Sequence, residues 1–243
     1  MSHTSHPYAI RIGVLRTWKS RWFSAHPKEY RKLLREDLEL RNFLEKRLRG
    51  MFVDSVEIER SPAIMSVVIK TARPGLLIGR GGEGVEKLKR EATKFLDSVR
   101  SAIAHTRVAH PLAHPGRVAE LRLVIEEVSA PESHAKVMAE QIAQDLEKRL
   151  PFRRVMKQSI GKMMSSRAVQ GAKVALAGRL DGSEMARHEW LKEGKIPLQT
   201  LRADVDFARG RARLPYGDIG IKVWIYRGEV FANDPKKIMK HHS

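Results

Sequence analysis

Four glycines lie close together in the stretch ARPGLLIGRGGEGVEKLKREATKFL, at positions 79, 81, 82 and 84. Glycine is favoured where the backbone must adopt a positive φ or approach another group closely. A loop of this kind can hold the phosphates of a dinucleotide or nucleoside triphosphate, can lie against the backbone of a nucleic acid, or can simply join two helices. The residues on either side of the glycines favour one of these uses over the others.

The dinucleotide interpretation rests on Gly79, Gly81 and Gly84, which satisfy the pattern GxGxxG. That pattern binds a dinucleotide when it follows a strand and when an acidic residue ends the next strand, about 20 positions on. Here Pro74-Gly75 interrupts the preceding strand, and Asp97 lies inside the helix that continues from the loop. No Gly-Lys-Ser or Gly-Lys-Thr follows, so a nucleoside-triphosphate loop is disfavoured too. A plain turn between helices stays open as an alternative.

The loop also fits a K-homology domain, in which a GxxG segment between two helices clamps about four nucleotides. Gly79, Arg80, Gly81 and Gly82 match GxxG, and Arg80 adds a cation. The helix that begins near Gly82 offers free N–H groups and its positive dipole end to a phosphate. We therefore predict that these four residues bind RNA.

The elements around the loop support the same domain. A helix is predicted over 27–50, opened by Pro27 and closed by Gly50. Strands with alternating apolar residues are predicted at 55–60 and 64–72, a short apolar helix before the glycines, a long helix over 83–103 and a strand at 121–128. This order resembles that of the prokaryotic-type (type II) K-homology domain. A segment rich in His and Pro, about 104–119, is predicted as an inserted loop.

The second half of the chain predicts another domain. After a linker at 129–133, helices are predicted over 134–150 and 152–166. Strand-like segments follow at 173–180, 184–194, 198–208 and 220–230. The fold class is therefore α+β: a K-homology domain at 27–128, then an α/β domain at 129–231 with two helices on a mixed or antiparallel sheet. Residues 1–26 are predicted to form a basic and aromatic arm, and residues 232–243 a tail.

The charge of the chain favours an anionic partner. Lys and Arg total 46 against 28 Asp and Glu, which gives +18. Such an excess favours nucleic acid over an anionic membrane surface. Between 148 and 179 there are nine basic residues and no acidic one. Within this window Arg153, Arg154 and Lys157 share one face of a helix and repel each other, which favours a surface that faces phosphates over an ordinary solvated face. The predicted RNA-binding residues outside the glycine loop are Arg153, Arg154, Lys157, Lys162, Arg167, Arg179, Arg11 and Trp22.

Several other classes of site are disfavoured. The chain has no cysteine, no signal-peptide pattern and no apolar run long enough to span a membrane, so we expect a cytoplasmic protein without membrane association. No carboxylate or thiolate accompanies His105, His110 and His114, and the carboxylate pairs Glu184/Glu189 and Asp204/Asp206 lack an apolar pocket. We expect no enzymatic activity, no cofactor, no metal and no small-molecule substrate. Trp190 and Trp224 are either core residues or base-stacking residues.

Five segments of the chain resemble one family, the universal small-subunit ribosomal protein three in its bacterial or organellar form. The segments are HPYAIRIG at 6–13, TARPGLLIGRGGEGVEKL at 71–88, FRRVMK at 152–157, GRLDGSEMARHEWLKEGKIPLQTLRADVDF at 178–207 and YGDIGIKVWIYRGE at 216–229. The resemblance implies a two-domain protein in the head of the small ribosomal subunit. It would be bound to ribosomal RNA and to neighbouring head proteins.

The resemblance also implies that Arg153, Arg154 and Lys157 line the channel through which messenger RNA enters, and that they help to unwind structured messengers without hydrolysing a nucleotide. One departure from the family is Gly81, because the second variable position of the GxxG loop is often basic or polar. The alternative function is a free K-homology protein that binds messenger RNA and regulates it. Less favoured are a dinucleotide-dependent enzyme, a lyase that uses a lysine, and a peripheral membrane protein.

Overall fold

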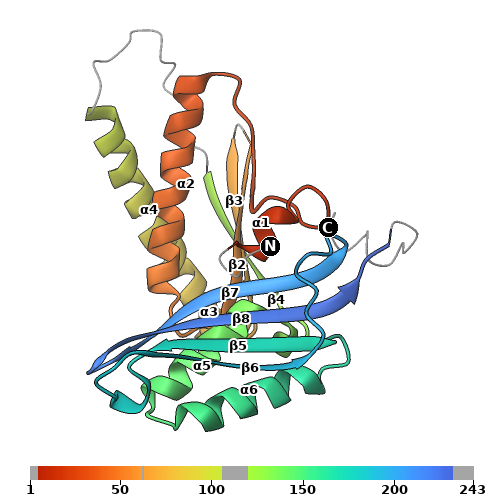
Figure 1. Cartoon of the computed structure of the whole chain (residues 1–243). Coiled ribbons are helices and arrows are strands. Elements are labelled where there is room, and N and C mark those ends of the chain that lie inside the picture. Colours follow the sequence, from red (N-terminus) through yellow and green to blue (C-terminus); the bar gives the residue numbers. More distant parts are fainter. Residues whose placement is uncertain (1–4, 62, 106–119, 232–243) are drawn as a thin grey trace. The chain divides into compact units, whose positions relative to one another are not determined.

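The structure, a computed structural model, describes residues 5–61, 63–105 and 120–231 (Figure 1). Most of the predicted insert at 104–119 and the whole predicted tail at 232–243 lie outside these residues. The described chain forms two compact units. One is Lys19–Val128, and the other combines the residues up to Trp18 with those from Ser129 onward. Within the described residues, no helix is both long enough and apolar enough to cross a membrane.

The unit Lys19–Val128 is built on one four-stranded sheet in the order β1-β2-β3-β4. Strands β2 and β3 are antiparallel, whereas β3 and β4 are parallel. Helices α2 and α4 pack on this sheet in one buried cluster and contact each other, and the ring of Phe43 stacks on that of Phe95 with centroids 4.6 Å apart. The elements are β1 (Ser20–Arg21), α2 (Pro27–Arg47), β2 (Val53–Arg60), β3 (Ile64–Thr71), α3 (Pro74–Ile78), η1 (Arg80–Gly82), α4 (Glu83–His105) and β4 (Glu120–Glu127).

The core of this unit follows directly from the sequence periodicities. Apolar residues of α2 and α4 recur at three- and four-residue steps, so each helix presents one continuous face to the sheet. The alternate residues Met65, Val67 and Ile69 of β3 are fully buried beneath them. The described helices and strands occur in the order that was predicted for a K-homology domain.

The second unit contains a four-stranded sheet in the order β6-β5-β8-β7, and every neighbouring pair is antiparallel. The sheet is therefore antiparallel, which decides between the two arrangements left open by the sequence. Its elements are α1 (Pro7–Ile10), η2 (Pro131–Ser133), α5 (Ala135–Glu147), α6 (Phe152–Ser165), β5 (Gly171–Gly178), η3 (Leu180–Gly182), β6 (Arg187–Gly194), β7 (Ala203–Leu214) and β8 (Gly217–Glu229).

Helices α5 and α6 cover the same face of the sheet, as Figure 1 shows. Ile142 of α5 and Ile160 of α6 lie in one buried cluster with inward residues of the strands, among them Val174 and Val223. The opposite face carries a smaller buried cluster that includes Phe207, Trp224 and Tyr226. Because strand residues alternate between faces, the register of the sheet fixes which residues lie on each side.

The structure does not keep residues 1–26 together as one arm. The described part up to Trp18 belongs to the unit of the β6-β5-β8-β7 sheet, and α1 contacts β7. From Lys19 the chain belongs to the other unit, where β1 pairs with β2. The arm is thus divided between two folded units. Its composition did not reveal this, because composition carries no information on long-range contacts.

Candidate nucleic-acid interfaces

The glycine loop joins α3 to α4 and is open to solvent. Gly79, Gly81 and Gly82 have φ values of 68°, 61° and 86°, in the region that side chains rarely adopt. A Cβ atom placed on Gly81 or Gly82 would meet no other heavy atom within 4 Å. Arg80 is exposed, and its side chain has no hydrogen bond or ion pair within the described residues. The loop therefore exposes backbone without side chains at its glycines, and one cation whose side chain has no partner among the described residues.

The fourth glycine of the stretch serves packing. A Cβ atom on Gly84, in the first turn of α4, would lie 2.3 Å from the carbonyl oxygen of Leu77 and 2.9 Å from that of Ile78. Only glycine allows α3 and α4 to approach this closely. Gly84 therefore completes the formal GxGxxG pattern for a structural reason, with no need for a dinucleotide.

Helix α6 separates its apolar and basic residues onto two faces. Phe152, Val155, Met156, Ser159, Ile160 and Met163 are buried. The basic residues Arg153, Arg154, Lys157 and Lys162 are all exposed, and none of their side chains has a hydrogen bond or ion pair within the described part of the chain. The guanidinium of Arg153 lies 5.7 Å from the ring centroid of Phe152. No acidic residue lies on α6. The three residues Arg153, Arg154 and Lys157 will be called the α6 cation triad; the structure brings them onto one exposed face, as the helical spacing predicted.

The other predicted cations of the 148–179 window lie elsewhere. Arg167 is exposed in the segment that follows α6. Arg179 follows β5, and its guanidinium donates to the carbonyl oxygens of Ser183 at 2.9 Å and Tyr216 at 3.3 Å. Lys173 points to the sheet face opposite the helices, where its neighbours are Trp190 and Trp224. The basic window is therefore not one surface.

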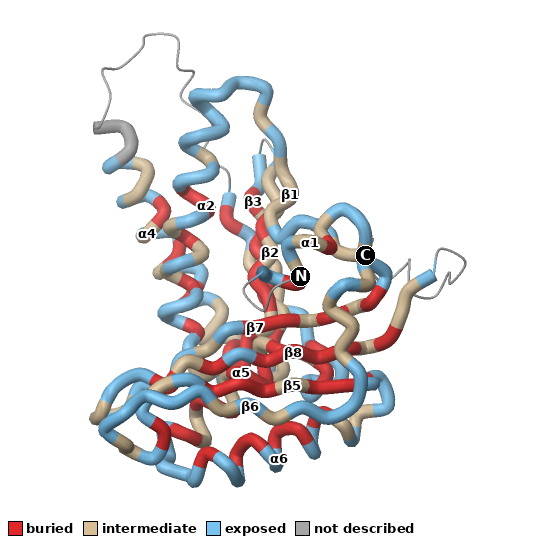
Figure 2. The backbone as a smooth tube through the Cα atoms, in the orientation of Figure 1, coloured by how far each residue is buried: buried red, intermediate tan, exposed pale blue. Residues whose placement is uncertain are grey.

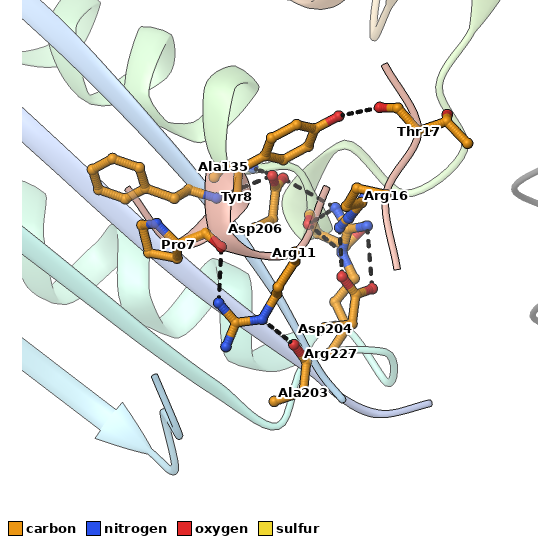
Figure 3. A network of polar contacts seen from close by, with 12 residues as sticks. Pro7, Tyr8, Arg11, Arg16, Thr17, Ala135, Ala203, Asp204, Asp206 and Arg227 are labelled. Atoms are coloured by element: carbon orange, nitrogen blue, oxygen red, sulfur yellow. Dashed lines mark hydrogen bonds and ion pairs between the residues drawn. The ribbon is translucent and has the colours of Figure 1, made fainter. Parts of the chain in front are cut away.

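Arg11 is not placed for RNA binding, contrary to the prediction. Its side chain is 0 % exposed. The guanidinium donates to the carbonyl oxygens of Ala203 at 2.7 Å and Pro7 at 2.9 Å, which Figure 3 shows. It also donates to the carbonyl oxygens of Thr200 at 2.9 Å, Leu198 at 3.1 Å and Pro197 at 3.4 Å. Burial lowers the pKa of Arg11, but the ring of carbonyls suits a cation. Arg11 therefore connects the end of α1 to β7 and to the segment that precedes β7.

Trp22 is held within the unit Lys19–Val128. Its indole nitrogen donates to a carboxylate oxygen of Asp37 at 2.6 Å, and its ring lies 5.1 Å from that of Tyr30. Arg60 lies 5.9 Å from the Trp22 ring centroid and pairs with the same carboxylate group. Trp22 is half-buried, so the contacts that the structure shows are internal ones.

The alternating carboxylates Asp204 and Asp206 of β7 belong to an internal network, which Figure 3 shows. Arg16 pairs with Asp204 at 2.5 Å, and Arg227 pairs with Asp206 at 3.1 Å. Asp206 also accepts the backbone N–H of Ala135, at the start of α5, at 2.8 Å. Burial opposes the ionisation of Asp206, but the charges of Arg227 and Arg16 outweigh it and lower its pKa. These carboxylates are paired structural groups.

Comparisons with known proteins agree with both units. Residues 39–132 match the family model of the KH domain, and residues 142–225 match that of the C-terminal domain of ribosomal protein S3. Three bacterial relatives are each named small ribosomal subunit protein uS3. The relative from Parvibaculum lavamentivorans is 43% identical over 97% of this chain and 90% of its own. The relative from Psychrobacter is 42% identical over 95% and 84%, and that from Syntrophomonas wolfei 42% identical over 95% and 91%.

The chain belongs to the uS3 family. The first matched region contains the glycine loop, and the second contains α6 and most of the β6-β5-β8-β7 sheet. Ten of the predicted RNA-binding residues lie in these two regions, whereas Arg11 and Trp22 lie before them. The match to the KH domain also explains why a loop of this shape joins α3 and α4.

One basic and aromatic surface was not predicted from the sequence. The sequence places Lys173 in a charged window and allows Trp190 either a core or a base-stacking role. Trp190 is 54 % exposed, whereas Trp224 is 5 % exposed. The alternation of residues in 187–194 and 171–178 was the available signal, but the two strands had to be paired before it placed these residues side by side.

Proposed function

We propose that this chain is a structural RNA-binding protein of the head of the small ribosomal subunit, and that the α6 cation triad acts on messenger RNA as it enters the ribosome. The glycine loop and the other exposed cations would contact ribosomal RNA. The observation that carries the proposal for messenger RNA is the α6 face itself. It presents three exposed cations, whose side chains have no ion pair or hydrogen bond within the described residues, within two turns of a helix that has no acidic residue.

The proposed action follows from a difference in binding between the two forms of the RNA. If the triad holds the phosphates of a strand only while that strand is unpaired, it stabilises the open form of the RNA relative to the closed form. A differential affinity of this kind shifts the equilibrium of a hairpin toward its open state. No nucleotide needs to be hydrolysed by this protein, because the binding free energy supplies the bias. Gly161, exposed on the same helix, leaves the backbone uncovered there, so a strand can lie close to α6.

The experiment replaces Arg153, Arg154 and Lys157 together by alanine in ribosomes that carry this protein. We expect slower translation of a messenger with a stable hairpin ahead of the reading ribosome, and unchanged translation of a matched messenger without one. The urea midpoint of the purified variant should stay near that of the wild type, since surface side chains without partners contribute little to stability.

The matched control replaces Lys28, Arg31 and Lys32, three exposed cations of α2 with the mirror-image spacing. This control removes the same charge, and it should not affect the two messengers differently. Equal impairment of both messengers by the triad variant would refute the role in unwinding. So would a control variant that discriminates between the messengers as strongly as the triad variant.

Assembly into the ribosome has a separate test. Non-specific phosphate contacts weaken steeply as salt rises. A component of the subunit should therefore stay with it through a density gradient at moderately high salt, at about one copy per particle. Loss of the protein from the particles at the first salt step would instead favour the free regulator of messenger RNA.

A further inference from the structure

The face of the β6-β5-β8-β7 sheet that lies opposite α5 and α6 will be called the outer sheet face. Cross-strand pairing places its residues in rows. One row runs Lys192, Lys173, Trp224, Phe207, and the next runs Trp190, Ala175, Lys222, Arg209. A third row runs His188, Ala177, Gly220, Arg211. Basic and aromatic side chains thus gather on this face from four strands.

Only part of the outer sheet face is covered by the chain itself. His6 packs edge-on against Phe207 with ring centroids 4.7 Å apart, and Ile196 and Leu198 pack on the same cluster. These residues do not cover the part of the face formed by β6. His188, Trp190 and Lys192 are exposed, and Figure 2 shows β6 as largely uncovered beside the buried β5 and β8. On the far side of β5, whose residue Ala175 in the row of Trp190 is buried, Lys222 and Arg209 are exposed as well.

Trp190 is the large apolar side chain of this uncovered part. Its cross-strand partners in the row are Ala175 and then Lys222, so a small residue separates the indole from the next long side chain. Strands lie about 4.8 Å apart, so Trp190 and Lys222 stand roughly 10 Å from each other. The Nζ atom of Lys173 lies 4.9 Å from the Trp190 ring and 5.1 Å from the Trp224 ring. An indole is therefore fixed in place, half exposed, beside cations.

The charges on this face are almost entirely of one sign. Lys173, Lys192, Lys222, Arg209 and Arg211 lie on it, and the carboxylates of β6, Glu189 and Glu193, alternate to the other side. Asp218 lies at its far end, directly opposite Arg213. Burial lowers the pKa of Lys173, and the charge of Lys192 lowers it further. This mutual repulsion would be relieved by an anion.

We propose that the outer sheet face binds a single-stranded segment of RNA, with one unpaired base stacked on Trp190 and the flanking phosphates held by Lys192 and Lys222. The proposal rests on the proposed RNA-binding function and adds a second surface to it. The phosphates of an RNA strand neutralise the excess of positive charge, and an exposed aromatic ring stacks with any base whose face is free. Bases in an intact helix do not offer that face, so the segment is a loop, a bulge or an end.

The primary test is ultraviolet cross-linking of small subunits that contain the full chain, followed by tryptic digestion and mass spectrometry. Trp190 lies in the short tryptic peptide HEWLK, residues 188–192. A nucleotide attached to this peptide is the expected result. Amine-reactive cross-linking of the same particles tests the other class of partner, because Lys192 and Lys222 both lie on this face. Links from these lysines to another protein, without any nucleotide on the peptide, would overturn the proposal.

Affinity measurements with the purified chain test the role of the ring. For a 12-nucleotide single-stranded RNA, Trp190→Ala should weaken binding about tenfold, the loss of one stacked base, or ~1.4 kcal/mol. Trp190→Phe should restore most of it. The control is Trp18→Ala in the same unit, since Trp18 is 61 % exposed but lies outside the outer sheet face; it should leave the affinity unchanged. Lys192→Ala with Lys222→Ala should lower the salt slope of binding by about 1.4.

The outcome for this surface is separable from that for α6. If the triad variant fails in translation while Trp190→Ala binds as the wild type does, the proposed function stands and the second surface is refuted. If Trp190→Ala weakens binding while the triad variant translates both messengers normally, the second surface stands and the role of α6 is refuted. Equal weakening by Trp190→Ala and Trp18→Ala would also overturn the stacking proposal.

Discussion

Replacing the buried Arg11 by methionine should destabilise the unit that contains the β6-β5-β8-β7 sheet. Methionine retains an unbranched chain of similar reach but donates no hydrogen bond. Three of the bonds made by Arg11 are shorter than 3.0 Å, those to the carbonyl oxygens of Ala203, Pro7 and Thr200. Hydrogen bonds from a charged donor contribute about 1.5 kcal/mol or more each, so these three account for about 4–5 kcal/mol.

Part of that loss is recovered, because the variant no longer has to bury a charge. We therefore expect the free energy of unfolding to fall by about 3 kcal/mol. With a urea dependence of about 2 kcal/mol per molar, the midpoint of this unit should move by roughly 1.5 M. Arg11→Lys should lose about 2 kcal/mol, since an ammonium group keeps the charge but cannot reach the same spread of carbonyls.

The assay is urea unfolding of the full chain, combined with hydrogen exchange of the segment 198–207. Exchange in this segment should speed up in the Arg11 variant, because Arg11 holds its carbonyls. The matched control is Arg202→Met, which removes an arginine that is 61 % exposed and pairs with Glu229 at 2.8 Å. An exposed pair contributes about 0–1 kcal/mol. A midpoint shift in Arg11→Met no larger than in Arg202→Met would refute the reasoning.

Two further predictions concern the folded state. Gly84→Ala should destabilise the unit Lys19–Val128 by about 2–3 kcal/mol, because the new Cβ would lie 2.3 Å from the Leu77 carbonyl oxygen. Gly81→Ala should destabilise it by only about 1 kcal/mol, because the new Cβ meets no other atom and only the positive φ is unfavourable. Urea midpoints of both variants test this order, and a larger loss in Gly81→Ala would contradict it. The pKa of Asp206 is lowered in the folded state, so its ionised form adds stability above the unfolded value of about 3.9, and this stability is lost as pH falls below it. Asp206→Asn should therefore destabilise the protein at pH 7 and progressively less toward pH 3; a difference that does not change with pH would count against the pairing with Arg227.

Much of the fold could be predicted because it depends on local patterns. The apolar faces of α2, α4 and α6 follow from helical periodicity, and alternation marks the strands on both sides of the glycines. The α6 cation triad is the clearest case in the site. Three residues at i, i+1 and i+4 share a helix face wherever the helix is placed. The apolar residues on the other face of α6 predict which face is buried, so the exposure of the triad could be predicted as well.

The two largest differences from the sequence-based expectations arise from contacts between distant segments. Arg11 was predicted to bind RNA because its neighbours are basic and aromatic, yet four of its five partners are carbonyl groups 186–192 residues further along the chain. The outer sheet face depends on a register that joins Lys173, Trp190 and Lys222 across three strands. A shift of one residue in that register would turn Trp190 toward the helices.

Most of the helices and strands, the loop between α3 and α4, the excess of positive charge and the resemblance to a family could be predicted from the sequence alone. These properties are carried by residue types at short spacings, which the chain keeps in any fold. Which cations reach solvent, in contrast, depends on the tertiary structure. The free energy of burying a guanidinium depends on the acceptors that surround it, and for Arg11 those acceptors are brought together by the packing of α1 against β7.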